Sequence, residues 1–226
     1  MLAQRLSAIL QSLENAAKAD HRPTPRLLAV SKTQTATAVA ALAAAGQRAF
    51  GENYVQEAQA KIRALAESGL EWHLIGHLQS NKAELAADIF DWVQTVDRLK
   101  LVAALARFRP PHRPPLNVLV QVNIDDETSK HGCAPEQVPE LAAAIVREPR
   151  LALRGLMAIP TPHPDLEARR PAYREMATLF NELAARHASI DTLSMGMSDD
   201  FPLAIAEGAT MVRIGTALFG PRAGKP

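Results

Sequence analysis

A lysine follows a short apolar run near the start of the chain, in LLAVSKTQ. Leu27 to Val30 predict a buried strand, and the threonines beyond them predict a loop that enters a helix. Strand alternation places Lys32 on the same face as Leu28 and Val30. Since a buried charge is costly, Lys32 either extends to water or is placed to react. An unprotonated amine can form an imine with an aldehyde. Burial and nearby cations lower the pKa of a lysine, and would therefore favour the unprotonated form of Lys32.

Two later stretches offer groups that bind anions. In MVRIGTALFG, Arg213 and Gly215 alternate along one strand face, and Gly215 and Thr216 would present a backbone N–H and a hydroxyl to a phosphate. In SMGMSDD, Ser198 precedes two acids and a helical segment, so we expect it to be a helix N-cap. An ordinary cap and a tight turn would also explain these residues, and the two interpretations remain open.

The elements that position these residues alternate between strand and helix. Eight strand candidates lie in RLLAVSK, RAFGEN, EWHLIG, DWVQTV, LNVLVQVNI, RLALRGLMAI, DTLSMGM and TMVRIGTALFG. Helices are expected over 1–20, 35–46, 54–69, 80–90, 97–108, 138–148, within 165–188 and over 200–209, with Gly46 and Gly69 as stops and Ser80 or Asn81 and Asp97 as caps.

Strand–helix alternation requires parallel strands, in an open doubly wound sheet or a closed barrel. Eight repeats without an extra helix to cover a free edge favour a single (β/α)8 barrel over residues 1–226, preceded by a helix over 1–20. Closing the barrel makes the last strand a neighbour of the first. Lys32 would then lie beside Arg213 and the phosphate cradle, an arrangement suited to a phosphorylated aldehyde.

Composition narrows the classes of partner. Of 226 residues, 47% are hydrophobic, and 25 Lys and Arg balance 24 Asp and Glu, which argues against nucleic acid and anionic membranes as partners. The one cysteine, Cys133, excludes an internal disulfide and a cysteine-based zinc cluster. With no signal peptide and no apolar run of about 18 residues, we expect a cytoplasmic protein. No apolar exposed seam stands out, so we expect a monomer.

Several long motifs resemble one family. AVSKTQ, FGENYVQE, WHLIGHLQSNK, NIDDETSKHG, RGLMAIP and LSMGMSDDFPLAIAEGATMVRIGTALFG are similar to the pyridoxal phosphate homeostasis proteins, from about residue 26 to 220. The resemblance implies a barrel of the alanine racemase N-terminal type that holds pyridoxal 5′-phosphate (PLP) as an aldimine on Lys32. It also implies phosphate contacts from Ser198, Gly215 and Thr216, Arg213 facing the pyridine nitrogen, and Asn53, Met195 and Met197 near the ring.

Two other positions bear on the resemblance. Lys130, in TSKHG, matches a family lysine near the mouth, with no role assigned to it. Gln34 replaces a second lysine that many relatives carry, so an accessory aldehyde acceptor is not expected there.

Three functions remain open: a carrier that buffers PLP and delivers it to apo-enzymes, a racemase-like enzyme, and a cofactor-free aldolase. Arginine at the pyridine nitrogen disfavours a protonated ring and deep carbanion chemistry. Racemases also need a second acid or base, supplied in the related enzymes by a tyrosine of a further domain, which a chain ending at Pro226 is not expected to carry. We expect Tyr173 to pack in the core. Tyr54 follows Asn53 at the mouth, where it could contact the ring, and no acid–base role is assigned to it.

Two histidines complete the candidates. His73 lies mid-strand, where a hydrogen-bonded core histidine is the expected state. His77 ends the third strand, and we expect a hydrogen bond within its loop rather than a titrating switch. The carrier, without catalysis, is the favoured function.

Overall fold

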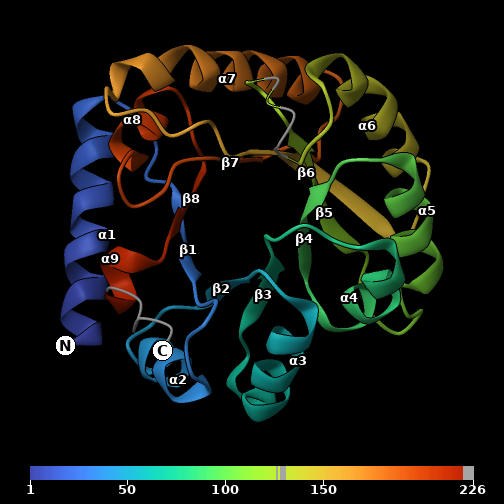
Figure 1. Cartoon of the computed structure of the whole chain (residues 1–226), viewed down its shortest axis with the longest axis horizontal. Coiled ribbons are helices and arrows are strands. Elements are labelled where there is room, and N and C mark those ends of the chain that lie inside the picture. The colour runs from blue at the N-terminus through green and yellow to red at the C-terminus, as the bar shows by residue number, and fades with distance from the viewer. Residues whose placement is uncertain (126, 128–130, 221–226) are drawn as a thin grey trace.

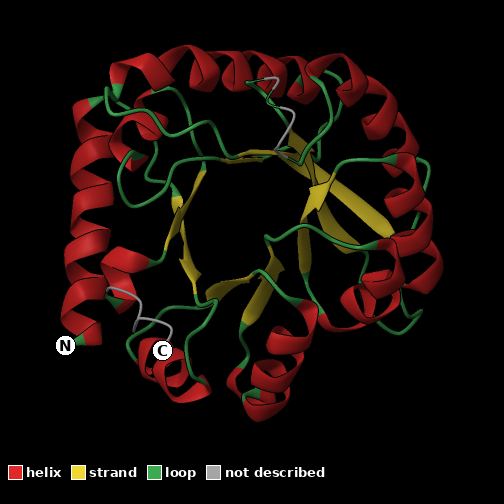
Figure 2. Cartoon of the chain, viewed as in Figure 1, coloured by secondary structure: helices red, strands yellow, loops and turns green. Residues whose placement is uncertain are grey.

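The computed structural model, which describes residues 1–125, 127 and 131–220, is a closed barrel of eight parallel strands surrounded by helices (Figures 1 and 2). This confirms the predicted (β/α)8 architecture. The strands are β1 (Arg26–Val30), β2 (Ala49–Glu52), β3 (Glu71–Leu74), β4 (Trp92–Val96), β5 (Leu116–Val122), β6 (Leu151–Ala158), β7 (Thr192–Ser194) and β8 (Met211–Ile214).

Among the described residues, the helices follow the predicted segments except for the last one, which falls in GTALFG, where the sequence predicted the end of the last strand and a loop. They are α1 (Leu2–Ala19), α2 (Ala36–Ala44), α3 (Val55–Ala64), α4 (Ala83–Ile89), α5 (Leu99–Phe108), α6 (Val138–Val146), α7 (Arg170–Ala184), α8 (Phe201–Ala206) and α9 (Thr216–Phe219). Short 3₁₀ turns occur at η1 (Ala66–Ser68), η2 (Ser80–Lys82), η3 (Pro135–Gln137) and η4 (Glu167–Arg169).

The barrel closes where β1 pairs with β8. The two strands run parallel in a four-residue register that begins with Arg26 opposite Met211 and ends with Ala29 opposite Ile214. The last strand therefore delivers its carboxyl end beside that of the first, as the sequence predicted.

Helix boundaries agree with the predicted glycine stops but not with every predicted cap. Gly46 and Gly69 take positive φ, which lets the chain leave α2 and η1. The N-cap of α5 is Arg98 and not Asp97. The Asp97 carboxylate instead accepts a hydrogen bond from the Arg98 guanidinium. Ser80 and Asn81 are not caps either, since both lie inside η2.

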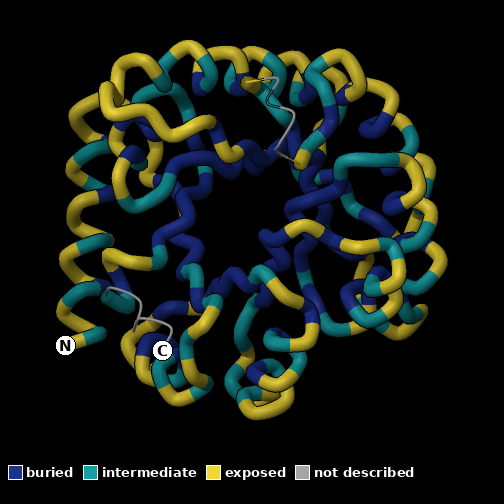
Figure 3. Tube along the Cα trace, in the orientation of Figure 1, coloured by how far each residue is buried: buried dark blue, intermediate teal, exposed yellow. Residues whose placement is uncertain are grey.

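The core lies mainly between the strands and the surrounding helices. Buried residues follow the ring of strands and the inward sides of the helices (Figure 3). Two smaller clusters are separate from this layer: Leu28, Ala49, Ile75 and Met211 in one, and Trp92, Leu119 and Met157 in the other.

Buried polar groups in the strands are hydrogen-bonded. His73 is fully buried, bonds through Nε2 to Glu71 (2.6 Å) and through Nδ1 to Gln94 (2.9 Å), and stacks on Trp92. Its burial lowers its pKa. The prediction of a satisfied core histidine is confirmed. None of the helices in the described ranges is both long and apolar enough to cross a bilayer.

Candidate functional site

A cavity of about 320 Å³ opens at the carboxyl ends of β1, β2, β3, β6, β7 and β8. This is the end of a (β/α)8 barrel at which ligands bind. Seven of the eight predicted site residues line it. The lining residues are Val30, Lys32, Thr33, Gln34, Asn53, Ile75, Ile159, Met197, Ser198, Asp199, Arg213, Gly215, Thr216 and Gly220.

Lys32 reaches this cavity from a turn and not from the strand itself. β1 ends at Val30, so the predicted strand alternation through Lys32 is wrong. The turn includes Thr33 at φ 65°, a left-handed conformation that is uncommon outside glycine. The Thr33 N–H donates to Glu57 Oε1 (2.6 Å), which holds that conformation in place. The half-buried Lys32 is thereby directed toward the mouth.

A buried ionic network supports the backbone just before Lys32. Lys61 Nζ donates to the Ser31 carbonyl (2.7 Å), to both oxygens of Glu52 (2.8 and 3.0 Å) and to Glu57 Oε1 (2.8 Å). Ser31 Oγ donates to Glu52 Oε1 (2.5 Å). Burial raises the pKa of Glu52, and the bonds from Lys61 and Ser31 oppose that shift.

Sequence reasoning did not single out Lys61. Its spacing of four residues from Glu57 is the ordinary signature of a solvent-exposed helical ion pair. The signal that would have separated it is its position on the buried face of α3 with Val55 and Ala58. On that face, a lysine needs an acidic partner from a neighbouring element.

Arg213 lines the cavity as a buried cation. Its side chain donates to Ser194 Oγ (2.9 Å) and to the Ala158 carbonyl (2.8 Å). Burial lowers its pKa to about 10, which still leaves the guanidinium charged at neutral pH. Both hydrogen-bond acceptors are neutral groups, on β7 and β6, and Asp200, whose charge acts on Arg213, is itself paired with Arg169.

The loop after β7 is fixed by a glycine and an aspartate. Gly196 has φ +89°, and a Cβ there would lie 2.6 Å from Ala204 Cβ, so only glycine lets the loop pass so close to α8. Asp200 accepts from the Met197 N–H (2.7 Å) and from Arg169 (2.6 Å). These contacts place Met197 and Ser198 at the cavity wall.

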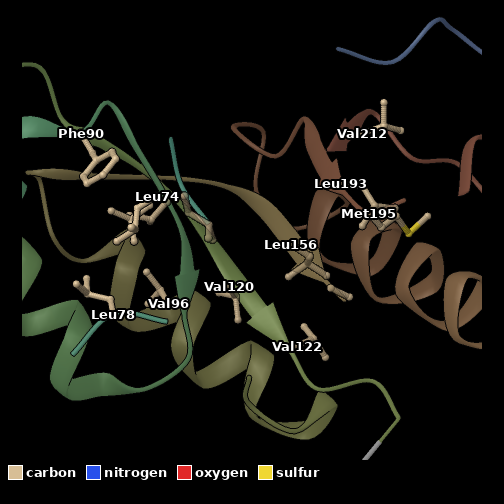
Figure 4. Packing of buried hydrophobic residues seen from close by; sticks show 14 of the residues in the cluster. Leu74, Leu78, Phe90, Val96, Val120, Val122, Leu156, Leu193, Met195 and Val212 are labelled. Atoms are coloured by element: carbon tan, nitrogen blue, oxygen red, sulfur yellow. The ribbon is translucent and has the colours of Figure 1, made fainter. Parts of the chain in front are cut away.

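Ser198 and Met195 depart from their predicted places. Asp200, not Ser198, is the N-cap of α8, because Pro202 falls in the first turn and the helix begins only at Phe201. Ser198 lies in the turn before it and still lines the cavity. Met195 is fully buried and belongs to the core cluster shared with Leu193 (Figure 4), so the structure does not bring it to the cavity.

Asn53 depends on a close backbone contact. It follows β2 at the cavity wall, and a Cβ on Gly76 would lie 2.2 Å from the Asn53 carbonyl oxygen. Tyr54, the next residue, is 63% exposed and is not among the lining residues, so the expected ring contact has no support in this geometry. Tyr173 is buried in the core, as predicted.

The remaining candidates lie elsewhere or outside the described residues. Lys130 is one of the residues that the structure does not describe. His77 stacks on His131, with ring centroids 3.7 Å apart, and its Nδ1 lies 3.9 Å from Asp97 Oδ2. Among the described residues, His77 makes no side-chain hydrogen bond within its loop, so that prediction is wrong. Burial and the neighbouring His131 lower the pKa of His77.

Together the cavity residues form a set with defined chemistry. One amine, one fixed guanidinium, the hydroxyl side chains of Thr33, Ser198 and Thr216, the carboxylate of Asp199 and a glycine-containing strand end line a common space. Such a set suits a ligand that carries both an anionic group and an electrophilic carbon.

Comparisons with known proteins agree with this geometry. The model of the alanine racemase N-terminal domain matches residues 5–223. The pyridoxal phosphate homeostasis protein of Escherichia coli is 56% identical over 199 residues, covering 87% of this chain and 85% of that protein. Its Haemophilus influenzae counterpart is 51% identical over 227 residues, covering 98% and 96%.

Solved structures give the same grouping. PipY of Synechococcus elongatus, solved without PLP, superposes with a TM-score of 0.88 at 36% identity, covering 97% of this chain and all of that one. The same protein with PLP bound gives a TM-score of 0.81. An alanine racemase from Clostridium difficile, at 17% identity and a TM-score of 0.64, shares the fold. The chain belongs to the pyridoxal phosphate homeostasis protein family, whose barrel is that of the alanine racemase N-terminal domain.

Proposed function

We propose that this chain binds PLP at the β1–β8 mouth and acts in PLP homeostasis without catalysing a reaction of its own. The observation that carries the proposal is the meeting of Lys32 with Arg213, Ser198 and Thr216 around one cavity. The PLP-bound structure of PipY and the names of the relatives at 50–56% identity support it.

The residues divide into three roles. Lys32 supplies the amine that binds the aldehyde carbon covalently, held by the turn that Glu57 and Lys61 support. Ser198, Gly215 and Thr216 face the phosphate from the last two loops, the usual phosphate position in such barrels. Arg213 would face the pyridine nitrogen, and Asn53 and Met197 would border the ring, since all three line the cavity.

The positive charge of Arg213 beside the PLP ring would favour binding of the cofactor over catalysis. PLP, when bound, supplies an electron sink whose strength depends on a protonated ring nitrogen. A guanidinium that stays charged at neutral pH disfavours that proton. The close relatives are named for homeostasis and not for an enzymatic activity.

The covalent attachment is tested by borohydride reduction followed by peptide mass analysis. We expect a pyridoxyl phosphate adduct on the peptide that contains Lys32, and its loss in Lys32→Ala with the fold retained. Lys100→Ala, at an exposed lysine of α5, is the matched control and should keep the adduct. An adduct that survives Lys32→Ala, or none in the wild-type chain, would refute the attachment. A wild-type chain that stays colourless with PLP and cleaves a sugar phosphate would instead support the aldolase.

Delivery and catalysis need separate tests. The PLP-loaded chain should reactivate an apo-enzyme at a higher rate than it releases PLP into solution. The release rate is measured with a reagent that captures free PLP. NMR of amino acids in D₂O should show no sustained exchange at the α-carbon, and exchange at enzyme-like rates would favour the racemase-like alternative. The cytoplasmic location, the monomeric state and a single domain over 1–226 remain predictions from the sequence.

A further inference from the structure

A second cavity, of about 260 Å³, lies beside the first and carries a group of side chains that the proposed function does not use. It shares Asn53, Ile75 and Ile159 with the first cavity, and its own wall includes His77 and His131. Ligand atoms of His77, Asp97 and His131 all lie within 4.8 Å of one another.

The three side chains come from the carboxyl ends of neighbouring strands. His77 follows β3, and Asp97 follows β4 directly. His131 is carried by a short segment that returns to β5, where Cys133 forms a bridge with Val122. The carboxyl ends of the parallel strands thus bring these three side chains to the same end of the barrel as the first cavity.

Backbone contacts fix where the two histidines can lie. The Gly76 carbonyl accepts from Thr95 Oγ1 (2.9 Å), which ties the residue before His77 to β4. The His131 carbonyl accepts from Gln121 Nε2 (3.1 Å). Gly132, at φ +127°, lies so close to β5 that a Cβ would be 2.6 Å from the Asn123 nitrogen. The segment that carries His131 is therefore held against the strand end.

The imidazoles are stacked without using their nitrogens. The ring centroids of His77 and His131 are 3.7 Å apart and the planes differ by 14°. Among the described residues, no hydrogen bond involves a ring nitrogen of either histidine, and the nearest acid is Asp97 Oδ2, 3.9 Å from His77 Nδ1. These separations exceed hydrogen-bond length and leave nitrogen lone pairs available to another ligand.

The carboxylate is oriented by an arginine. Arg98 donates to Asp97 Oδ1 (2.5 Å) and, through its other nitrogen, to the Leu78 carbonyl (2.8 Å). The second oxygen of Asp97 remains on the histidine side. Outer contacts of this kind fix the direction of ligating carboxylates in metal sites.

We propose that His77, Asp97 and His131 bind a divalent transition-metal ion of the Zn²⁺ type. Two imidazole nitrogens and one carboxylate oxygen suit Zn²⁺ and its first-row neighbours, whereas Mg²⁺ and Ca²⁺ prefer oxygen ligands alone. Metal–ligand bonds of about 2.0–2.2 Å require the three groups to draw together and at least one imidazole to turn out of the stack, because the nitrogen lone pairs of two parallel rings lie in parallel planes and cannot meet at one ion. Both histidine side chains are exposed enough to make that movement.

The test is a titration of the tag-free chain with Zn²⁺ alone, in which the heat of binding is measured by calorimetry. We expect one ion per chain, with affinity reduced at least about tenfold in Asp97→Asn and more in the His77→Ala, His131→Ala double variant. The double variant His112→Ala, His163→Ala removes two exposed histidines that are not part of the cluster and should bind as the wild type does. Circular dichroism confirms that each variant is folded.

Co²⁺ gives a second measurement that does not depend on heat. Bound at this cluster it should show the visible absorption of a low-coordinate nitrogen–oxygen site, and the signal should disappear in the His77→Ala, His131→Ala variant. Zn²⁺ affinity equal in that variant and the wild type would overturn the proposal. So would a wild-type chain that binds no ion at millimolar Zn²⁺.

Discussion

At the scale of single residues, Lys61 shows how the structure holds an ion pair out of water. The Lys61 side chain is 7% exposed and that of Glu52 is fully buried. Such a pair is costly to desolvate, yet removing one partner is worse because the other charge is left alone. Lys61 also donates to the Ser31 carbonyl, so its loss would release the residue that precedes Lys32.

We expect Lys61→Ala to lower the free energy of unfolding by about 3–5 kcal/mol, because Glu52 would remain buried without its cation. Chemical denaturation measures this change. Lys18→Ala is the control, since Lys18 pairs with Glu14 at the same spacing on an exposed face, and it should cost less than about 1 kcal/mol. An equal loss of unfolding free energy in the two variants would show that the buried network stabilises the chain no more than an exposed ion pair does.

His73 gives a prediction about pH. Burial lowers its pKa in the folded state below the ordinary value of 6.5, so the unfolded chain takes up a proton more readily. The contribution of His73 to stability is complete above about pH 6.5 and declines as pH falls below it, by at most about 1.4 kcal/mol per pH unit.

The comparison is between the wild type and His73→Gln, an uncharged residue that can still bond to Gln94. Denaturation at about pH 7.5 and about pH 5.5 should show a smaller loss of stability in His73→Gln. His112→Gln, at an exposed site, should lose as much as the wild type. A steeper pH dependence in His73→Gln would contradict the assigned shift.

At the scale of elements, the contact between the loops after β2 and β3 decides the shape of the cavity wall. The Gly76 backbone lies against Asn53, and no side chain fits between them. Gly51 is different, because a Cβ there would meet only side-chain tips of Ile75 and Leu28 at 3.0 and 3.2 Å. The two glycines therefore form a matched pair for one experiment.

Gly76→Ala should destabilise the chain by about 1–3 kcal/mol and weaken PLP retention, because the loop of Asn53 must move. Gly51→Ala should cost less and leave PLP retention near the wild-type level. Denaturation and equilibrium dialysis with PLP measure the two effects. If Gly76→Ala retains PLP as tightly as Gly51→Ala does, the position of Asn53 is unimportant for binding.

The sequence predicted the elements well and their ends less well. Apolar runs separated by amphipathic segments were sufficient for all eight strands, since burial on both faces leaves a local pattern. The end of β1 at Val30 and the start of α8 at Phe201 depend on contacts from other elements: Glu57 with Thr33, and Arg169 with Asp200. No local pattern carries those partners.

The candidate site shows the same division. Lys32, Arg213 and Thr216 were recognisable because their types and strand-end positions suit a phosphorylated aldehyde. Met195 and Met197 are indistinguishable by spacing in SMGM, and only the packing of the loop sends one to the core and the other to the cavity. The group of His77, Asp97 and His131 combines three separate loops, so its parts meet only in the folded chain.

At the scale of the whole molecule, α1 braces the side of the barrel where it closes. It packs against α8, α9 and α2, and Arg5 Nη1 donates to the Leu218 carbonyl (3.4 Å) (Figure 1). Leu6, Leu13 and Ala17 form its buried stripe. The helix thus supports the two short helices that follow the proposed phosphate loops.

Leu13→Ala should reduce the free energy of unfolding by about 2–5 kcal/mol, because it leaves a cavity under α1. Leu10→Ala lies on the same helix at 47% exposure and should cost far less. Both variants keep every residue proposed to touch PLP. Denaturation compares them, and near-equal costs would mean that α1 does not brace the barrel.

The pairing of β1 with β8 also has a consequence for synthesis. Lys32 is translated just after β1, but the strand that completes its surroundings, Met211–Ile214, is translated only after the other seven strands. Until β8 has been made, Lys32 belongs to a nascent polypeptide that lacks the proposed phosphate contacts of Gly215 and Thr216. The proposed PLP site therefore exists only once β8 has paired with β1, so cofactor loading as proposed would follow the completion of the barrel.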